Sequence, residues 1–310
     1  MDMRLTEDQL SLADTIRTYL AKTHGPDVLR RLDAEGNRDD AIWQGLVEMG
    51  LTGLLVPEAE GGLGLGLLDA ALIAAECGRA CLAEPLVDTA FIAVPWLLRQ
   101  GRVDQLGDIA AGNLKFPLPH AINPWVADGE GERLESVDPL RNLAARLDEV
   151  TDDPDLLDLG ALFSAAQLVG LGEAMLWQAT EYAKIRQQFG QPIGAFQAVK
   201  HQLATAMVSL EFAKPVVWRA AQSLEEKTPY AAIAVSHAKV AAGDAACAMA
   251  EAAIQVHGAM GYTYEVDLHF WMKRSWALAA AWGDRAFHLG RIDKAVIGNT
   301  MPIGPQHSFV

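Results

Sequence analysis

The chain has 310 residues, with 25 Lys and Arg against 40 Asp and Glu, so its formal net charge is −15 at pH 7. This acidic balance argues against a nucleic-acid-coating protein and against docking on anionic membranes, because both functions need a basic face. Hydrophobic residues make up 51% of the chain and charged residues 21%, which excludes a disordered chain and allows one large domain or two.

The three cysteines, Cys77, Cys81 and Cys247, have neither disulfide nor metal-ligand spacing. We therefore expect no metal site, and two buried thiols at Cys77 and Cys81. The charged, amphipathic start of the chain lacks a signal-peptide core, and apolar runs such as Ala90 to Leu98 are too short to span a bilayer. These features predict a cytoplasmic protein.

Helical periodicity dominates the first 112 residues. We expect helices over Leu5 to Lys22, from Asp39 or Asp40 to Gly50, from Leu67 to Ala80, and from Glu84 to about Arg99. His24-Gly25-Pro26 should end the first of these helices, and Gly50 should stop the second.

The composition changes near Gly112. Residues 113–150 contain four of the fourteen prolines and little helical periodicity, so short extended pieces are expected at Lys115–Leu118, Ala121–Ala127 and Arg133–Val137. Four long helical segments follow, at about 155–187, 194–226, 228–257 and 266–295. The sequence thus predicts a mainly α fold, with an N-terminal helical domain (1–112), a short β-like middle segment (113–150) and a C-terminal four-helix bundle (151–310).

Two segments differ from ordinary bundle sequence. In RQQFGQPIGAFQ, which begins at Arg186, an arginine lies beside amides and aromatic rings, a combination that suits a phosphate-linked ligand with a ring. From the residues alone, the favoured interpretation is a plain helix–helix turn whose phenylalanines enter the core. In QVHGAMGYTYE, which begins at Gln255, two glycines three residues apart allow close approach of a pyrophosphate or another subunit. Neither segment has the Rossmann glycine spacing.

Three stretches carry a resemblance to one known family. RQQFGQPIGAFQAVKHQLA resembles the R-x-x-F-G-x-x-I-x-x-F-Q segment of the acyl-CoA dehydrogenase family, and QVHGAMGYTYEVDLHFWMKRSW resembles its Q-x-H-G-G-x-G-Y-T-x-E segment. Upstream, LVEMGLTGLLVPEAEGGLGLGLLDAALIAAECGRA is similar to its G-L-x-x-x-x-V-P-E-x-x-G-G-x-G stretch. The three matches occur in order over nearly the whole chain, which is therefore identified as a member of this family.

The resemblance implies helical domains around a β-domain that together hold FAD and an acyl-CoA thioester. In the family a carboxylate removes the α-proton and the flavin takes the β-hydride. The resemblance assigns the adenine-diphosphate half of FAD, often bound across a dimer interface, to these cofactor-binding residues: Arg186, Phe189, Gly190, Phe196, Gln197, Gln255, His257, Gly258 and Gly261.

The chain departs from the family pattern in its middle and at the base. The family's T/S-E-P-x-x-G-S-D and W-x-T/S-N-G-like segments, which line the flavin ring and the thioester, are absent, and 38 residues are too few for an eight-stranded domain. The usual glutamate base falls on Trp282, which cannot accept a proton. A second family position for the base falls on Gly160. Asp284 and Asp158 are the nearby candidate bases, and no catalytic residue is assigned.

The favoured hypothesis is a shortened, non-catalytic subunit of a heteromeric acyl-CoA dehydrogenase, resembling the smaller partners of enzymes that act on bulky esters such as steroid side chains. FAD would be shared with a full-length subunit that binds the acyl-CoA substrate, and an electron-transfer flavoprotein is a further candidate partner. A hetero-oligomer or a homodimer is expected. Two alternatives stay open: a homomeric flavoenzyme with Asp284 or Asp158 as base, and a family-derived binding or scaffold protein.

Overall fold

Local capping residues set the ends of the N-terminal helices in the computed structural model, which describes residues 4–36, 39–128, 132–145 and 150–304. Thr6 accepts a hydrogen bond from the Gln9 backbone N–H, and the Gln9 side chain accepts one from the Thr6 N–H, so the first helix begins with a capping box. The helices of this part are α1 (Glu7–Thr23), α2 (Pro26–Glu35), α3 (Asp40–Glu48), α4 (Leu67–Arg79), α5 (Val94–Arg99) and α6 (Leu106–Ala110).

Two of these helices, α2 and α6, are not predicted from the sequence. Pro26 is not simply a stop: it lies at the start of α2, where the missing proline N–H has no intrahelical partner to lose. The single helix predicted from Glu84 to Arg99 is also wrong in detail, because residues Val87–Ala93 form a π-helical stretch that precedes α5.

The middle segment forms one small antiparallel sheet of three strands, β1 (Trp125–Ala127), β2 (Glu132–Leu134) and β3 (Leu143–Ala145), in the order β1–β3–β2. Ala144 of the central strand pairs with Val126 on one side and with Arg133 on the other. The predicted extended pieces overlap β1 and β2, whereas Lys115–Leu118 forms no strand and β3 is not predicted. Leu143–Ala145 lacks β-branched residues and so gives no strand signal.

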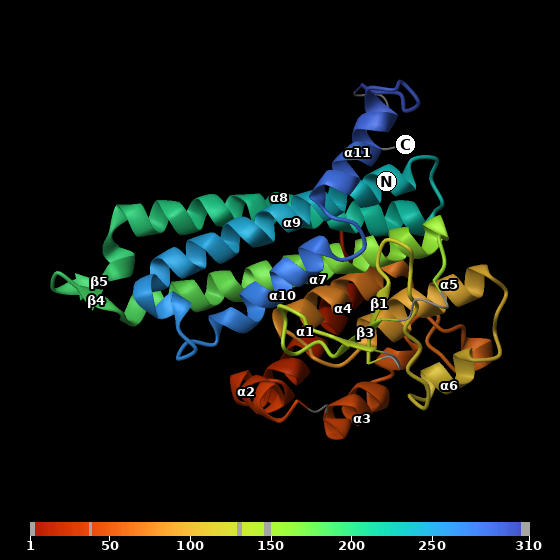
Figure 1. Cartoon of the computed structure of the whole chain (residues 1–310), viewed down its shortest axis with the longest axis horizontal. Coiled ribbons are helices and arrows are strands. Elements are labelled where there is room, and N and C mark those ends of the chain that lie inside the picture. Colours follow the sequence, from red (N-terminus) through yellow and green to blue (C-terminus); the bar gives the residue numbers. More distant parts are fainter. Residues whose placement is uncertain (1–3, 37–38, 129–131, 146–149, 305–310) are drawn as a thin grey trace.

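The C-terminal bundle consists of α7 (Pro154–Ile185), α8 (Gln197–Glu225), α9 (Ala231–His257), α10 (Leu268–Ala280) and α11 (Arg285–Val296). The fourth predicted segment is therefore two helices, separated at Trp282 and Gly283, which both have positive φ angles (57° and 93°). Figure 1 shows the N-terminal helices packed along one side of this long bundle. The mainly α architecture with a much reduced β-segment, as predicted, is confirmed.

The central helix is α7, which packs against α4, α8, α9 and α10. By length and composition, α7 is apolar enough to cross a membrane, so the expectation that every apolar run is too short is wrong. However, 83% of its most apolar window is buried inside the protein, as in the core helix of a bundle. Its apolarity is explained by burial on all sides.

Candidate functional site

The two predicted cofactor segments lie at the same end of the bundle, where α7 passes to α8 and α9 passes to α10 (Figure 1). The first contains a hairpin of β4 (Gln187–Gln188) and β5 (Gln191–Pro192). Its two turn residues, Phe189 and Gly190, both have positive φ angles (53° and 79°), as a tight two-residue hairpin requires. This turn projects the Phe189 side chain into solvent, where it is 91% exposed.

The exposed hairpin contradicts a plain turn in which both phenylalanines enter the core. The Phe189 ring meets Phe196 edge-on, with 6.1 Å between ring centroids. Arg186 ends α7, is exposed, and makes no side-chain ion pair with any described residue. Gln197 begins α8, and its Oε1 lies 3.2 Å from Nε2 of His201. The segment therefore presents an exposed aromatic ring, the Gln197 amide, and a guanidinium that has no ion pair within the described part of the chain.

The second segment contributes a groove and a loop. Gln255 on α9 is exposed and lines a groove of about 560 Å³ between α8 and α9, together with His201, Gln202 and Thr205. Gly258 ends α9 with φ 61° and ψ −137°, a conformation that an L side chain rarely adopts. Gly261 is buried, and a Cβ there would lie 2.9 Å from the Ile254 carbonyl oxygen.

His257 is turned into the packing between helices. Its ring stacks on Tyr182 at 4.3 Å between centroids, and its Nδ1–H donates to the Ala253 carbonyl oxygen at 2.8 Å. Burial lowers the pKa of His257, so a neutral imidazole is favoured. Arg186, Phe189, Gln197 and Gln255 are exposed and have the chemistry that suits the adenine-diphosphate half of FAD, namely a cationic fork, an aromatic ring and two amides.

The two family positions for the base meet in the structure. Trp282, which is 4% exposed, packs in the α10–α11 turn directly against Gly160 of α7. A Cβ on Gly160 would lie 2.0 Å from Cδ2 of the Trp282 ring. The indole ring therefore fills the space at the two positions where the resemblance leads us to expect a base, and an indole N–H cannot act as a base.

Three side chains hold the Trp282 turn, and two of them, Asn123 and Lys239, come from distant segments. The Trp282 N–H donates to Oδ1 of Asn123 at 3.0 Å, and its carbonyl oxygen accepts from Nε2 of His288 at 3.0 Å. Lys239 of α9 donates to the carbonyl oxygens of Leu278 and Ala279, at 2.7 and 2.8 Å, and so caps the end of α10. The sequence analysis does not single out any of these residues for this role. Lys239 could have been noticed, because it is a single lysine in an otherwise Ala-rich helix.

The two candidate acids already have structural partners. Oδ1 of Asp284 accepts from the Phe287 N–H at 2.8 Å and caps the exposed start of α11. Asp158 is buried and pairs with Nη1 of Arg291 at 2.7 Å, and burial raises the pKa of its carboxyl group. A role for either residue as a base remains a prediction. Within the described ranges, no group of three or more His, Cys, Asp or Glu side chains is placed to hold a metal ion.

Lys239 predicts a rise in stability with pH. Burial lowers the pKa of Lys239 to about 7, whereas an unfolded lysine keeps its proton up to about pH 10.4. Between these values the unfolded chain binds more protons, so the free energy of unfolding should rise by up to about 1.4 kcal/mol per pH unit. A neutral amine keeps two N–H groups for its two carbonyl acceptors.

Urea unfolding at pH 7, 8 and 9 tests this, with Lys239→Met as the matched control that cannot titrate. Other groups also titrate in this range, including Cys77 and Cys81, whose pKa values are raised by burial. Their contributions cancel in the difference between the two proteins. Parallel stability curves for the two proteins between pH 7 and 9 would contradict the prediction.

Comparisons with known proteins identify the two helical parts. The acyl-CoA dehydrogenase N-terminal domain matches residues 6–107, and the acyl-CoA dehydrogenase C-terminal domain matches residues 155–297. The stretch that neither domain matches contains the small three-stranded sheet. The pattern agrees with two family domains on either side of a reduced middle segment.

Similar proteins support the same assignment. Acyl-CoA dehydrogenase IpdE2 of Mycobacterium tuberculosis is 32% identical over 295 residues, which cover 87% of this chain and 91% of the relative. A chain of the ChsE4–ChsE5 complex from the same species has a TM-score of 0.79 at 23% identity, covering 96% of this chain and 99% of that one. A chain of the Tcur3481–Tcur3483 steroid ACAD variant has a TM-score of 0.82 at 22% identity, with the same coverage. The chain therefore belongs to the acyl-CoA dehydrogenase family.

Proposed function

We propose that this chain is the non-catalytic subunit of a heteromeric acyl-CoA dehydrogenase and completes the FAD site of a longer partner. The observation that carries the proposal is the packing of Trp282 on Gly160, which fills both family positions for the base. At the other end of the bundle, where α7 passes to α8, Arg186 and Phe189 are exposed and so are available to a cofactor shared with another subunit. These features support a chain that helps to hold a cofactor but has no proton acceptor at either family position for the base.

The residues of this chain would bind and orient the adenine-diphosphate half of FAD. The Arg186 fork would donate to phosphate oxygens, the amides of Gln197 and Gln255 would supply further hydrogen bonds, and Phe189 would cover a ring face. The flavin ring supplies the hydride acceptor when the cofactor is bound. The base and the flavin-ring contacts would come from the partner, because the described residues between 113 and 150 form three short strands and no larger sheet.

Two of the similar proteins are compatible with this role. The ChsE4–ChsE5 structure is a complex of two named chains, and the Tcur3481–Tcur3483 structure is a steroid ACAD that also carries two names. By analogy, we propose a bulky, ring-containing acyl-CoA ester as the partner's substrate. An electron-transfer flavoprotein would accept the electrons from the assembled enzyme.

The decisive experiment compares the purified chain alone with the chain co-expressed with a longer family member encoded by a neighbouring gene. We expect flavin absorbance and dehydrogenase turnover from the complex and neither from the lone chain. Stoichiometric FAD and turnover from the lone chain would overturn the proposal and favour the homomeric flavoenzyme. In that case, Asp284→Asn and Asp158→Asn would identify the base.

Arg186→Ala in the complex should weaken FAD binding by about 2 kcal/mol or more, which is roughly thirtyfold in Kd, because a charge-assisted phosphate contact is lost. Lys184→Ala removes the same charge two residues away and is the matched control. It should change the Kd little, since Lys184 is exposed and already pairs with Glu181 at 2.5 Å. Titration of the apo-complex with FAD measures both constants, and equal losses in the two variants would exclude a specific role for Arg186.

A further inference from the structure

A cavity of about 770 Å³ lies between the N-terminal helices and the bundle. Its walls come from α1, the α1–α2 turn, α4, the C-terminal half of α7 and the region where α9 passes to α10. We call it the interdomain pocket and define it by Leu20, Trp177, Tyr182, Ile185, His257 and Trp271. Cavities of this size at domain boundaries, with apolar and aromatic walls, are typical of small-molecule sites.

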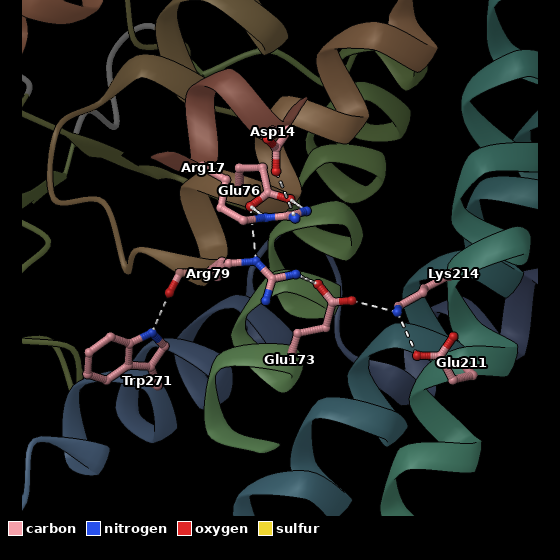
Figure 2. Close-up of polar contacts among 8 residues, drawn as sticks. All are labelled: Asp14, Arg17, Glu76, Arg79, Glu173, Glu211, Lys214 and Trp271. Carbon is pink, nitrogen blue, oxygen red and sulfur yellow. Dashed lines mark hydrogen bonds and ion pairs between the residues drawn. The ribbon is translucent and has the colours of Figure 1, made fainter. Parts of the chain in front are cut away.

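A chain of alternating charges, drawn in Figure 2, contributes Arg17, Glu76 and Arg79 to the lining of the pocket. The buried carboxylate of Glu76 accepts hydrogen bonds from Nη2 of Arg17 at 2.7 Å and from Nε of Arg79 at 3.0 Å. Arg79 also pairs with Glu173, which in turn pairs with Lys214 of α8 at 2.5 Å. Both arginines of this lining are therefore already neutralised by carboxylates.

Two of the rings that line the pocket, Trp271 and His257, have a polar atom hydrogen-bonded inside the protein. The Trp271 indole N–H donates to the Arg79 carbonyl oxygen at 2.8 Å, as Figure 2 shows. Nδ1–H of His257 donates to Ala253, and its ring stacks on Tyr182. Rings whose polar edges are already paired offer a ligand mainly carbon surface.

Two large apolar side chains remain in water at the rim of the pocket. Trp177 is 65% exposed and Ile185 is 76% exposed, and they lie eight residues apart on the same face of α7. Exposed apolar side chains grouped beside a cavity commonly mark a binding site. A ligand seated between them would remove both from water.

The charge of the pocket restricts the ligand. Its lining contains the carboxylates of Glu76, Glu181, Glu265 and Asp267 but only the two guanidinium groups of Arg17 and Arg79, which leaves a net charge of −2 with histidines neutral. An anion such as a nucleotide would find no unpaired cation in this lining, because Arg17 and Arg79 are both held by carboxylates. We propose that the interdomain pocket binds an uncharged, apolar, ring-containing molecule, held between Trp177, Tyr182 and Trp271.

This site is separate from the filled base position. Gly160 lies 14 residues before Ala174, the first α7 residue to line the pocket, which corresponds to about 21 Å along the helix. The proposal does not depend on the heteromeric function, because every residue that it uses belongs to this chain. It adds a second ligand class to a protein whose family cofactor is an anion.

Nile red, an uncharged fused-ring dye that fluoresces in apolar surroundings, is the probe. It is titrated into the full chain, alone and in complex with the longer subunit, and into three variants. Ala174→Trp should fill the pocket from its α7 wall, and Trp177→Glu should place a charge at the rim without disturbing the fold, because Trp177 is exposed. Trp276→Glu makes the same substitution on α10, at an exposed tryptophan that does not line the pocket.

We expect saturable binding of one dye molecule, at least tenfold weaker in Ala174→Trp and in Trp177→Glu and within twofold of the original chain in Trp276→Glu. Equal affinities in all four proteins, or binding that never saturates, would overturn the proposal. Displacement of the dye by ADP would overturn it in favour of a cofactor site. If the longer subunit displaces the dye and Trp177→Glu prevents complex formation, the pocket is a subunit contact and the proposal is again overturned. The proposed function is tested by the flavin content of the lone chain. That result does not affect any of the dye-binding measurements, so the two proposals can fail separately.

Discussion

Replacing Arg274 by methionine is expected to destabilise the chain by about 3–5 kcal/mol, because it leaves the buried carboxylate of Asp138 without its partner. Arg274 on α10 is 2% exposed and Asp138 of the middle segment is fully buried, and the two form an ion pair. Nη1 of Arg274 also donates to the Leu82 carbonyl oxygen at 2.8 Å. One guanidinium thus joins the bundle, the middle segment and the N-terminal helices.

Urea unfolding of Arg274→Met and of the double variant Arg274→Met/Asp138→Leu separates the lost pair from the lost packing. The double variant should recover much of the stability, since removing both charges avoids an unpaired buried carboxylate. Arg285→Met is the matched control, because Arg285 and its partner Asp244 are both exposed, and it should change little. A loss in Arg274→Met no larger than in Arg285→Met would show that the buried pair contributes nothing.

The same ion pair shows how a reduced middle segment stays attached. Three strands of three residues each cannot bury a sheet core of their own. Instead, Asp138 reaches Arg274, and Arg141 pairs with Asp88 at 3.3 Å. The segment is therefore fixed to the helices by charged contacts in addition to the burial of residues such as Leu140.

Elements with local signals were predictable from the sequence. The start of α7 follows from Asp153, whose side chain accepts the Asp155 N–H, and from Pro154 in the first turn. The turn at Phe189 and Gly190 is set by the local backbone conformation of these two residues. The segment could therefore be recognised from the sequence as different from ordinary bundle sequence. The helix α2 was not, because a proline after glycine is typical of a helix end as well as of a helix start.

Features that depend on distant contacts were not predictable. The motif placed Trp282 at the family's base position, but only packing reveals that its ring lies on Gly160. The break between α10 and α11 is fixed by Lys239 and Asn123, which lie 43 and 159 residues before Trp282. The interdomain pocket is likewise lined by five separate parts of the chain, and no single segment of the sequence indicates it.

The effect of Gly160→Ala on the free energy of unfolding is expected to change sign when Trp282 is replaced by alanine. In the natural chain the new Cβ would lie 2.0 Å from the Trp282 ring, and such overpacking should cost about 1–3 kcal/mol. Trp282→Ala alone should cost about 3–5 kcal/mol, the usual range for truncating a buried tryptophan. Once the ring is gone, Gly160→Ala should instead stabilise the chain by about 0.5–1 kcal/mol, because alanine is favoured over glycine within a helix.

Gly243→Ala on α9 is the matched control for this cycle, because nothing lies within 4 Å of the Cβ it would add. It should stabilise the chain by about 0.5–1 kcal/mol whether or not Trp282 is present. Urea unfolding of the single and double variants measures all of these values. If Gly160→Ala changes the free energy of unfolding in the same direction with Trp282 and with Ala at position 282, the ring does not occupy the space beside Gly160. The central observation for a non-catalytic role is then lost. A change of sign confined to Gly160 means that the indole itself fills that space, so a carboxylate there and the native packing cannot coexist.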